Sequence, residues 1–190
     1  GGLGCLLTLL VGVQVISSQG PPGPPPHHGG GPPHKCAGPP QGVKDPQSCC
    51  QAKPMFSEEE LAECGFEKFD EESRQGPPQP PHCSKQECLL KKRDLLNADS
   101  TINYDAVRAY MQSWVDANPE FKSAVETATS VCLGENGPPG PKQVCEANRL
   151  MFCVGAVVFT NCPNWQDTDD CKRLKEHMAE CRGPNFPPPN

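Results

Sequence analysis

The sequence predicts an all-α protein, a compact bundle of about six helices that disulfide bonds cross-link. Thirteen cysteines in 190 residues are the first indication. Apolar side chains recur at helical spacing between proline-rich breaks, which is typical of short helices rather than of strands. Because only 35% of the residues are hydrophobic, below the average for globular domains, covalent cross-links are expected to supplement a modest core.

Residues 1–19 are predicted to be a signal peptide with a truncated start. Residues 3–16 carry no charge and are mostly apolar, but this run is shorter than the roughly 20 residues that a membrane span requires. Small polar residues follow at Ser17 and Ser18, as at a signal-peptidase site, although neither a methionine nor a basic segment precedes the run. The alternative is a buried strand or helix.

Residues 20–45 are predicted to form a flexible arm rich in proline and glycine. Its glycines do not fall at every third position, which excludes a collagen triple helix. Its histidines suit either a soft metal site or a plain linker, and the linker is the interpretation that we adopt. The folded domain is expected over residues 46–182, and residues 183–190 are expected to be a loose tail.

Two capping boxes are expected to open the first two helices. Ser57 with Glu60 has the spacing in which each residue satisfies a backbone N–H of the other. Ser84 with Glu87 has the same spacing and predicts a second helix that runs to about Leu96.

The third and fourth helices are predicted from caps followed by apolar stripes. Asn103 can cap the third helix, and Asn118 followed by Pro119 suits the N-cap and first position of the fourth. The stripe of the third helix consists of Val107, Tyr110, Met111, Trp114 and Val115. The stripe of the fourth consists of Phe121, Ala124, Val125, Ala128, Val131 and Cys132.

A fifth helix is expected between residues 142 and 162. It is apolar on nearly every side from Leu150 onward, which is typical of a helix that other helices surround. The β-branched residues of 154–160 leave a strand as the alternative. A last amphipathic helix is predicted over about 168–181, with the acidic and hydroxyl residues of 167–170 as its cap.

Twelve cysteines remain once Cys5 of the apolar N-terminal run is set aside, and they are expected to form six disulfides in a secreted, extracellular protein. Zinc sites usually contain close CxxC pairs, and no two of these cysteines have that spacing. Adjacent Cys49 and Cys50 suit two different bridges. The twelve are Cys36, Cys49, Cys50, Cys64, Cys83, Cys88, Cys132, Cys145, Cys153, Cys162, Cys171 and Cys181.

Helix geometry restricts the pairing of these cysteines. In a helix, Cys83 and Cys88 would lie about 7.5 Å apart, and Cys145 and Cys153 about 12 Å apart. Bridged Cα atoms lie within about 7 Å of each other, so these neighbours should each pair with a cysteine of another helix. The remaining connectivity stays open at this point.

Composition and motifs exclude several functional classes. A net charge of −6 does not suit binding to nucleic acid or to an anionic membrane. The sequence contains no GxSxG, HExxH or phosphate-loop motif, so we expect neither an enzyme nor a bound cofactor or metal. The acidic groups at 58–60 and 70–72 are interpreted as solvated helix ends rather than as acid–base pairs.

The spacing of the later cysteines carries a family resemblance. Cys88 and Cys132 are separated by 43 residues, Cys132 and Cys153 by 20, and Cys153 and Cys162 by eight. Pro163 follows directly, and further cysteines flank these on both sides. This combination resembles insect odorant-binding proteins, in particular the Plus-C subgroup of mosquitoes, over about residues 36–181.

One spacing departs from that family, which usually has three residues between its second and third cysteines. Cys83 and Cys88 have four between them. The resemblance implies a helical bundle around an apolar cavity and three shared bridges. These would be Cys64–Cys88, Cys83–Cys153 and Cys132–Cys162.

The resemblance also implies a function, namely non-covalent transport of small hydrophobic, odorant- or lipid-like molecules. A membrane odorant receptor and a second copy of the chain are further expected partners, with no insertion into a membrane. The alternative function is that of a secreted cysteine-rich interaction, inhibitor or salivary effector protein. The predicted ligand contacts, each of which could instead pack in a dry core, are Tyr104, Val107, Tyr110, Met111, Trp114, Phe121, Val125, Leu150, Met151, Val154 and Val158.

Overall fold

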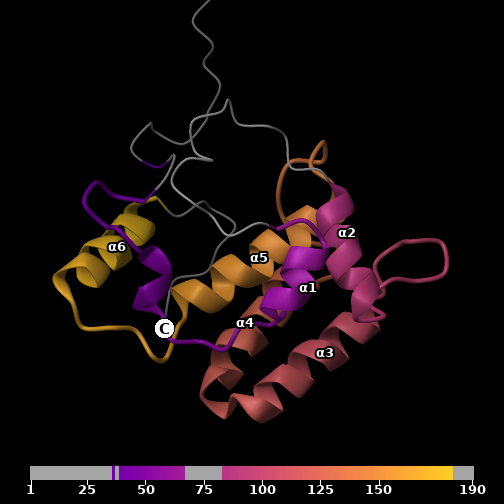
Figure 1. The fold of residues 1–190 in the computed structure, drawn as a ribbon, viewed down its shortest axis with the longest axis horizontal. Coiled ribbons are helices and arrows are strands. Elements are labelled where there is room, and N and C mark those ends of the chain that lie inside the picture. The colour runs from indigo at the N-terminus through magenta and orange to yellow at the C-terminus, as the bar shows by residue number, and fades with distance from the viewer. Residues whose placement is uncertain (1–35, 37–38, 67–82, 182–190) are drawn as a thin grey trace, which may run out of the picture. The chain divides into compact units, whose positions relative to one another are not determined.

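The computed structural model describes residues 36, 39–66 and 83–181, all within one compact unit, Pro32–Asn190. Six α-helices and two short 3₁₀ helices make up its regular structure in these ranges (Figure 1). Extended pairing in the same residues is limited to two isolated bridges, Cys50 with Trp165 and Leu96 with Ile102. The all-α prediction is therefore confirmed. The predicted signal peptide, the arm up to residue 35 and the tail lie outside the described residues.

Helix α1 (Glu58–Glu63) begins with the predicted capping box. The Ser57 hydroxyl accepts a hydrogen bond from the Glu60 backbone N–H at 3.2 Å, and the Glu60 carboxylate accepts one from the Ser57 N–H at 2.7 Å. Gly65 follows with φ +80°, a left-handed conformation that glycine adopts without strain and that ends the helix.

Helix α2 (Cys83–Lys92) corrects two predictions. Ser84 lies inside the first turn, so it is not the residue that caps the helix. The helix also ends at Lys92 rather than near Leu96, because Asp94 takes a left-handed φ of 56° and the Leu95 N–H turns back to the Leu90 carbonyl at 2.9 Å. The sequence offers no glycine at this break, which is why helical spacing alone extends the helix too far.

The two serines make a matched pair for measurement. We expect Ser57→Ala to lower the free energy of unfolding by about 1 kcal/mol, because it removes the acceptor for the Glu60 N–H. Ser84→Ala should change it by no more than about 0.5 kcal/mol, because Ser84 is exposed within α2. Urea denaturation of both variants, followed by circular dichroism, checks this. Equal losses in the two variants would contradict the assignment of the cap.

Helices α3 (Tyr104–Ala117) and α4 (Lys122–Cys132) are joined by the 3₁₀ turn η4 (Pro119–Phe121). Asn103 caps α3 as predicted, its side chain accepting from the Ala106 N–H at 3.0 Å. Asn118 does not cap α4. Because Pro119 opens the tight turn first, the Asn118 side chain instead turns back and donates to the Trp114 carbonyl at 2.8 Å.

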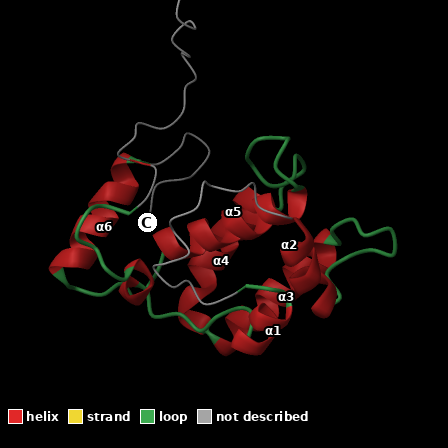
Figure 2. Ribbon diagram, turned by 45° about the horizontal axis from the view of Figure 1, so that its top comes forward, coloured by secondary structure: helices red, strands yellow, loops and turns green. Residues whose placement is uncertain are grey.

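Helix α5 (Glu146–Thr160) is helical throughout, so the strand alternative is wrong. The expectation that other helices surround it is also wrong, since Phe152 is 69% exposed and Gly155 is exposed beside it. The reason is that α5 packs against α4 and α2, which bury the opposite side of the helix. Figure 2 shows α4 and α5 side by side.

Helix α6 (Asp169–Glu180) is capped by Thr168, whose hydroxyl accepts from the Cys171 N–H at 3.2 Å. It packs against the short turn η2 (Pro46–Cys49), and the two lie together in Figure 1. A small apolar cluster forms between them, with Phe159, Trp165 and Met178 packed around it. Its buried members are Val43, Cys49, Cys171 and Leu174.

The three inner disulfides link α1 to α2, α2 to the start of α5, and α4 to α5. Cys64–Cys88 is confirmed. The implied bridges Cys83–Cys153 and Cys132–Cys162 are wrong, because the structure pairs Cys83 with Cys145 and Cys132 with Cys153. The interleaved order, first with third, second with fifth and fourth with sixth, is nevertheless kept. The two wrong bridges have one cause. The six cysteines that form the inner bridges include Cys145, whereas the implied pairing used Cys162 in its place.

The three outer disulfides are nested. Cys36–Cys181 encloses Cys49–Cys171, which encloses Cys50–Cys162. The prediction that adjacent Cys49 and Cys50 serve different bridges is confirmed. So is the prediction that the neighbours Cys83 and Cys88, and Cys145 and Cys153, do not pair with each other. The outer bridges attach the segment before α1 to the chain that follows α5.

Candidate functional site

The candidate site is the large apolar core between α2, α3, α4 and α5, here called the interior cluster. Ten of the eleven predicted ligand contacts belong to it or pack against it, and Met151 does not. Tyr104, Tyr110 and Trp114 are partly buried at its margin. The seven that are buried within it are Val107, Met111, Phe121, Val125, Leu150, Val154 and Val158. The amphipathic stripes of α3, α4 and α5 bring them together, because each helix turns its apolar face inward.

Aromatic side chains line the α3 margin of the interior cluster. The rings of Trp114 and Phe121 meet edge to face, with centroids 5.1 Å apart and planes at 66°. Tyr110 stacks at 6.0 Å on Phe56, and its hydroxyl donates a hydrogen bond to the Met55 carbonyl. The irregular segment before α1 therefore lies over this margin of α3.

An ion pair fixes the same margin to α1 and α2. The Arg93 guanidinium lies 2.6 Å from the Glu60 carboxylate and 5.5 Å from the centre of the Tyr110 ring. The hydrogen bond from the Ser57 backbone, together with Arg93, holds the pKa of Glu60 below its usual value. Burial raises the pKa of Tyr110, so its hydroxyl keeps its proton and remains a donor to Met55.

Tyr104 lies at a polar corner rather than in the interior. Its hydroxyl donates to the Glu146 carboxylate, and burial, with that carboxylate, raises the pKa of Tyr104 above its usual range. Arg149 donates to the Pro138 carbonyl at 2.6 Å and to the Val144 carbonyl at 3.0 Å. Gly137 has φ +69°, and a Cβ there would lie 3.1 Å from the Tyr104 hydroxyl. These contacts tie the loop between α4 and α5 to α3, through Tyr104, and to α5, through Arg149.

Two buried side-chain polar atoms in the described part of the chain have no hydrogen-bond partner, Gln86 Oε1 and Trp114 Nε1. Gln86 is 9% exposed, and its Nε2 donates to Asn148 at 3.3 Å. Sequence reasoning did not select Gln86. The available signal was its spacing with Leu89 and Leu90, which places a lone amide on the buried face of α2.

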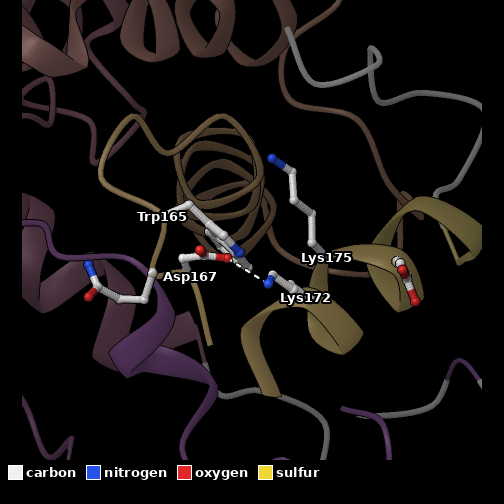
Figure 3. Close-up of a pocket in the computed structure, with 6 residues that line it drawn as sticks. Trp165, Asp167, Lys172 and Lys175 are labelled. Carbon is white, nitrogen blue, oxygen red and sulfur yellow. Dashed lines mark ion pairs between the residues drawn. The ribbon is translucent and has the colours of Figure 1, made fainter. Parts of the chain in front are cut away.

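A surface pocket of about 400 Å³ lies between Trp165 and α6, outside the interior cluster (Figure 3). Asp167 and Lys172 form an ion pair of 2.8 Å beside the Trp165 ring, and Lys175 stands on the other side of that ring. The hydrogen bond between them lowers the pKa of Asp167 and raises that of Lys172. Gln166 and Glu176 complete the lining. Equal numbers of positive and negative side chains give this pocket no preference for the sign of a ligand's charge.

A second surface groove, of about 540 Å³, follows the outer junction of α3 and α4. Val115 and Val125 contribute apolar floor, so Val125 is the one predicted ligand contact that lines it. Arg108, Lys122 and Glu126 stand among its charged and polar walls. An open groove with charged walls suits a polar surface contact better than the burial of a hydrophobic molecule.

The described residues contain no group of three or more His, Cys, Asp or Glu side chains placed to hold a metal ion. Within the same ranges, no helix combines the length and the apolar character that crossing a membrane would require.

Comparison with known proteins adds one relative. No family model matches the chain, and no solved structure matches it. The chain is 27% identical over 147 residues to general odorant-binding protein 68 of Anopheles gambiae, which covers 70% of this chain and 68% of the relative. A homologue of that name supports the resemblance to odorant-binding proteins, whereas membership of the Plus-C subgroup stays a prediction.

Proposed function

We propose that this chain is a secreted, non-enzymatic carrier that binds small hydrophobic, odorant- or lipid-like molecules in its interior cluster. The similarity to an Anopheles general odorant-binding protein carries the proposal. The gathering of ten predicted contacts in one apolar cluster supports it. No reactive group is needed, since the ligand would bind by leaving water.

The affinity would come from apolar surface that the ligand removes from water, at about 25 cal/mol per Å². The cross-links between α2, α4 and α5 hold the walls of the cluster in place before binding, which lowers the ordering cost. Met111, buried at 2% exposure, is an unbranched side chain that can adapt to ligands of different shape. The membrane receptor and the homodimer stay predictions.

A second candidate function is a protein-interaction or effector role, and one observation favours it. Phe152 is 69% exposed on the outer side of α5, and it is the one large apolar side chain that the described residues leave exposed. A protein that acts through such a surface would need no space for a ligand in its interior.

Displacement of a hydrophobic fluorescent probe from the native, oxidised protein separates the two functions. Val154→Phe adds volume inside the interior cluster, and Phe152→Ala removes an apolar group from the outer side of the same helix. The carrier function predicts probe uptake that falls at least several-fold in Val154→Phe and is unchanged in Phe152→Ala. Melting curves establish that both variants are folded. No uptake by the unmodified protein would contradict the carrier function.

A further inference from the structure

We propose that the indole N–H of Trp114 selects, among hydrophobic ligands, those that carry an oxygen acceptor such as a ketone or ester carbonyl. This inference rests on the proposed carrier function and deepens it by naming the ligand class. A pure hydrocarbon of the same length would fill the same space without a partner for this N–H.

The observation is that Trp114 Nε1 is buried and that no acceptor of the described residues reaches it. The other indole and the two phenol groups of the sequence are satisfied. Trp165 Nε1 donates to the Cys171 carbonyl at 3.2 Å, Tyr104 donates to Glu146 and Tyr110 to Met55. Trp114 is thus the exception among the two tryptophans and two tyrosines of the sequence, all of which are described.

Its position fits a ligand contact. Trp114 packs against the interior cluster from α3, and its ring meets the fully buried Phe121 edge to face. Its backbone carbonyl accepts from the Asn118 side chain, which closes the end of the helix. The contact with Phe121 holds the ring in place, so the N–H has a fixed direction toward which a ligand oxygen can orient.

The chemistry of the indole restricts the ligand. An indole nitrogen only donates, so it pairs with a carbonyl, ether or hydroxyl oxygen and gains nothing from an alkane. A buried donor without a partner is costly, and a ligand that supplies the acceptor removes that cost. We therefore expect an acceptor-bearing ligand to bind roughly tenfold more tightly than its hydrocarbon counterpart.

Gln86 is the rival anchor, because its Oε1 is also unpartnered. A carbonyl oxygen of an amide accepts, so it would select alcohols and amines but not ketones. Reversing the oxygen and nitrogen of Gln86 alone would break the hydrogen bond of its Nε2 with Asn148 Oδ1. In the present assignment a methyl ketone, which accepts and cannot donate, separates the two anchors. Gln86→Met removes the rival anchor in either orientation of the two amides.

The test compares a methyl ketone with the alkane of equal chain length, each displacing a fluorescent probe from the oxidised protein. The unmodified protein and Gln86→Met should prefer the ketone roughly tenfold. Trp114→Phe should lose that preference while binding the alkane within about twofold of the unmodified protein. A ketone preference that survives in Trp114→Phe overturns the inference.

A second measurement needs no variant. The two indole N–H signals of ¹⁵N-labelled protein correspond to Trp114 and Trp165, and Trp165, already bonded to Cys171, serves as the internal reference. The ketone should move the Trp114 signal to higher frequency, whereas the alkane should not. Equal binding of ketone and alkane overturns this inference alone. Binding of neither ligand overturns the carrier function as well.

Discussion

Replacing Cys132 and Cys153 together by alanine should lower the free energy of unfolding by about 3 kcal/mol or more. The chain-entropy relation gives about 3 kcal/mol for the sequence separation of 21 residues that this bridge closes. Both cysteines lie in the interior cluster, at 0% and 1% exposure, so the variant also leaves a void between α4 and α5. The melting temperature should fall by on the order of 10 °C.

The outermost bridge provides the control. Its separation of 145 residues would by itself predict a loss of about 5 kcal/mol when Cys36 and Cys181 become alanine. Because Cys49–Cys171 lies inside it, the bridge closes only the stretches from Cys36 to Cys49 and from Cys171 to Cys181, which together are about as long as the loop of the inner bridge. The entropic losses of the two variants should therefore be similar. Both outer cysteines are only half-buried, so their removal leaves no interior void, and we expect the outer double variant to lose less stability than the inner one.

Urea unfolding of the two double variants, each with its other five disulfides verified by mass spectrometry, measures the difference. A larger loss from the outer pair would mean that the nested bridges act independently of one another. It would also mean that burial of Cys132 and Cys153 adds little to the stabilisation that closing the loop between them provides.

Local signals account for the part of the fold that the sequence predicts. The Ser57 capping box, the Asn103 cap and the Thr168 cap involve residues three apart, so their geometry follows from the helix itself. The end of α2 depends instead on Asp94, which adopts a left-handed conformation although it is not a glycine. The sequence therefore contains no signal that predicts this end. Ser84 shows the limit of such a motif, since the correct spacing does not fix where the helix begins.

Contacts between distant residues account for what the sequence leaves open. Spacing shows that Cys145 and Cys153 cannot pair with each other, but the choice of partner depends on how α5 packs against α2 and α4. The exposure of Phe152 also depends on how α5 packs. Helical periodicity shows which positions of a helix are apolar, but it does not show which sides of the helix other elements cover.

The sequence likewise predicts one part of the candidate site and leaves another part open. Amphipathic stripes predict which side chains become buried, and ten of the eleven selected residues reach the interior cluster or its margin. A stripe does not predict how much space remains between such side chains. Nor does it show that Trp114 Nε1 lacks an acceptor while Trp165 Nε1 has one, because hydrogen-bond partners are set by the packed fold.

Phe121→Ala should lower the free energy of unfolding by about 3–5 kcal/mol, which makes it the most destabilising single substitution that we predict. Phe121 is fully buried at 0% exposure, and its ring meets Trp114 edge to face at 5.1 Å. Its removal therefore loses apolar burial and an aromatic contact and leaves a void between η4 and α3.

Phe152→Ala is the matched control, since it deletes the same ring from a position that is 69% exposed. It should change stability by no more than about 0.5 kcal/mol. Chemical denaturation of both variants below their melting temperatures gives the two values. A loss of more than about 2 kcal/mol in Phe152→Ala would show that a partner segment or a second copy covers the outer side of α5.

If the interior cluster is where ligands bind, folded Phe121→Ala should in addition accept a bulkier probe than the unmodified protein does. The void would lie directly beside Trp114, so the gain in probe size should be absent from Phe152→Ala, in which no interior contact changes.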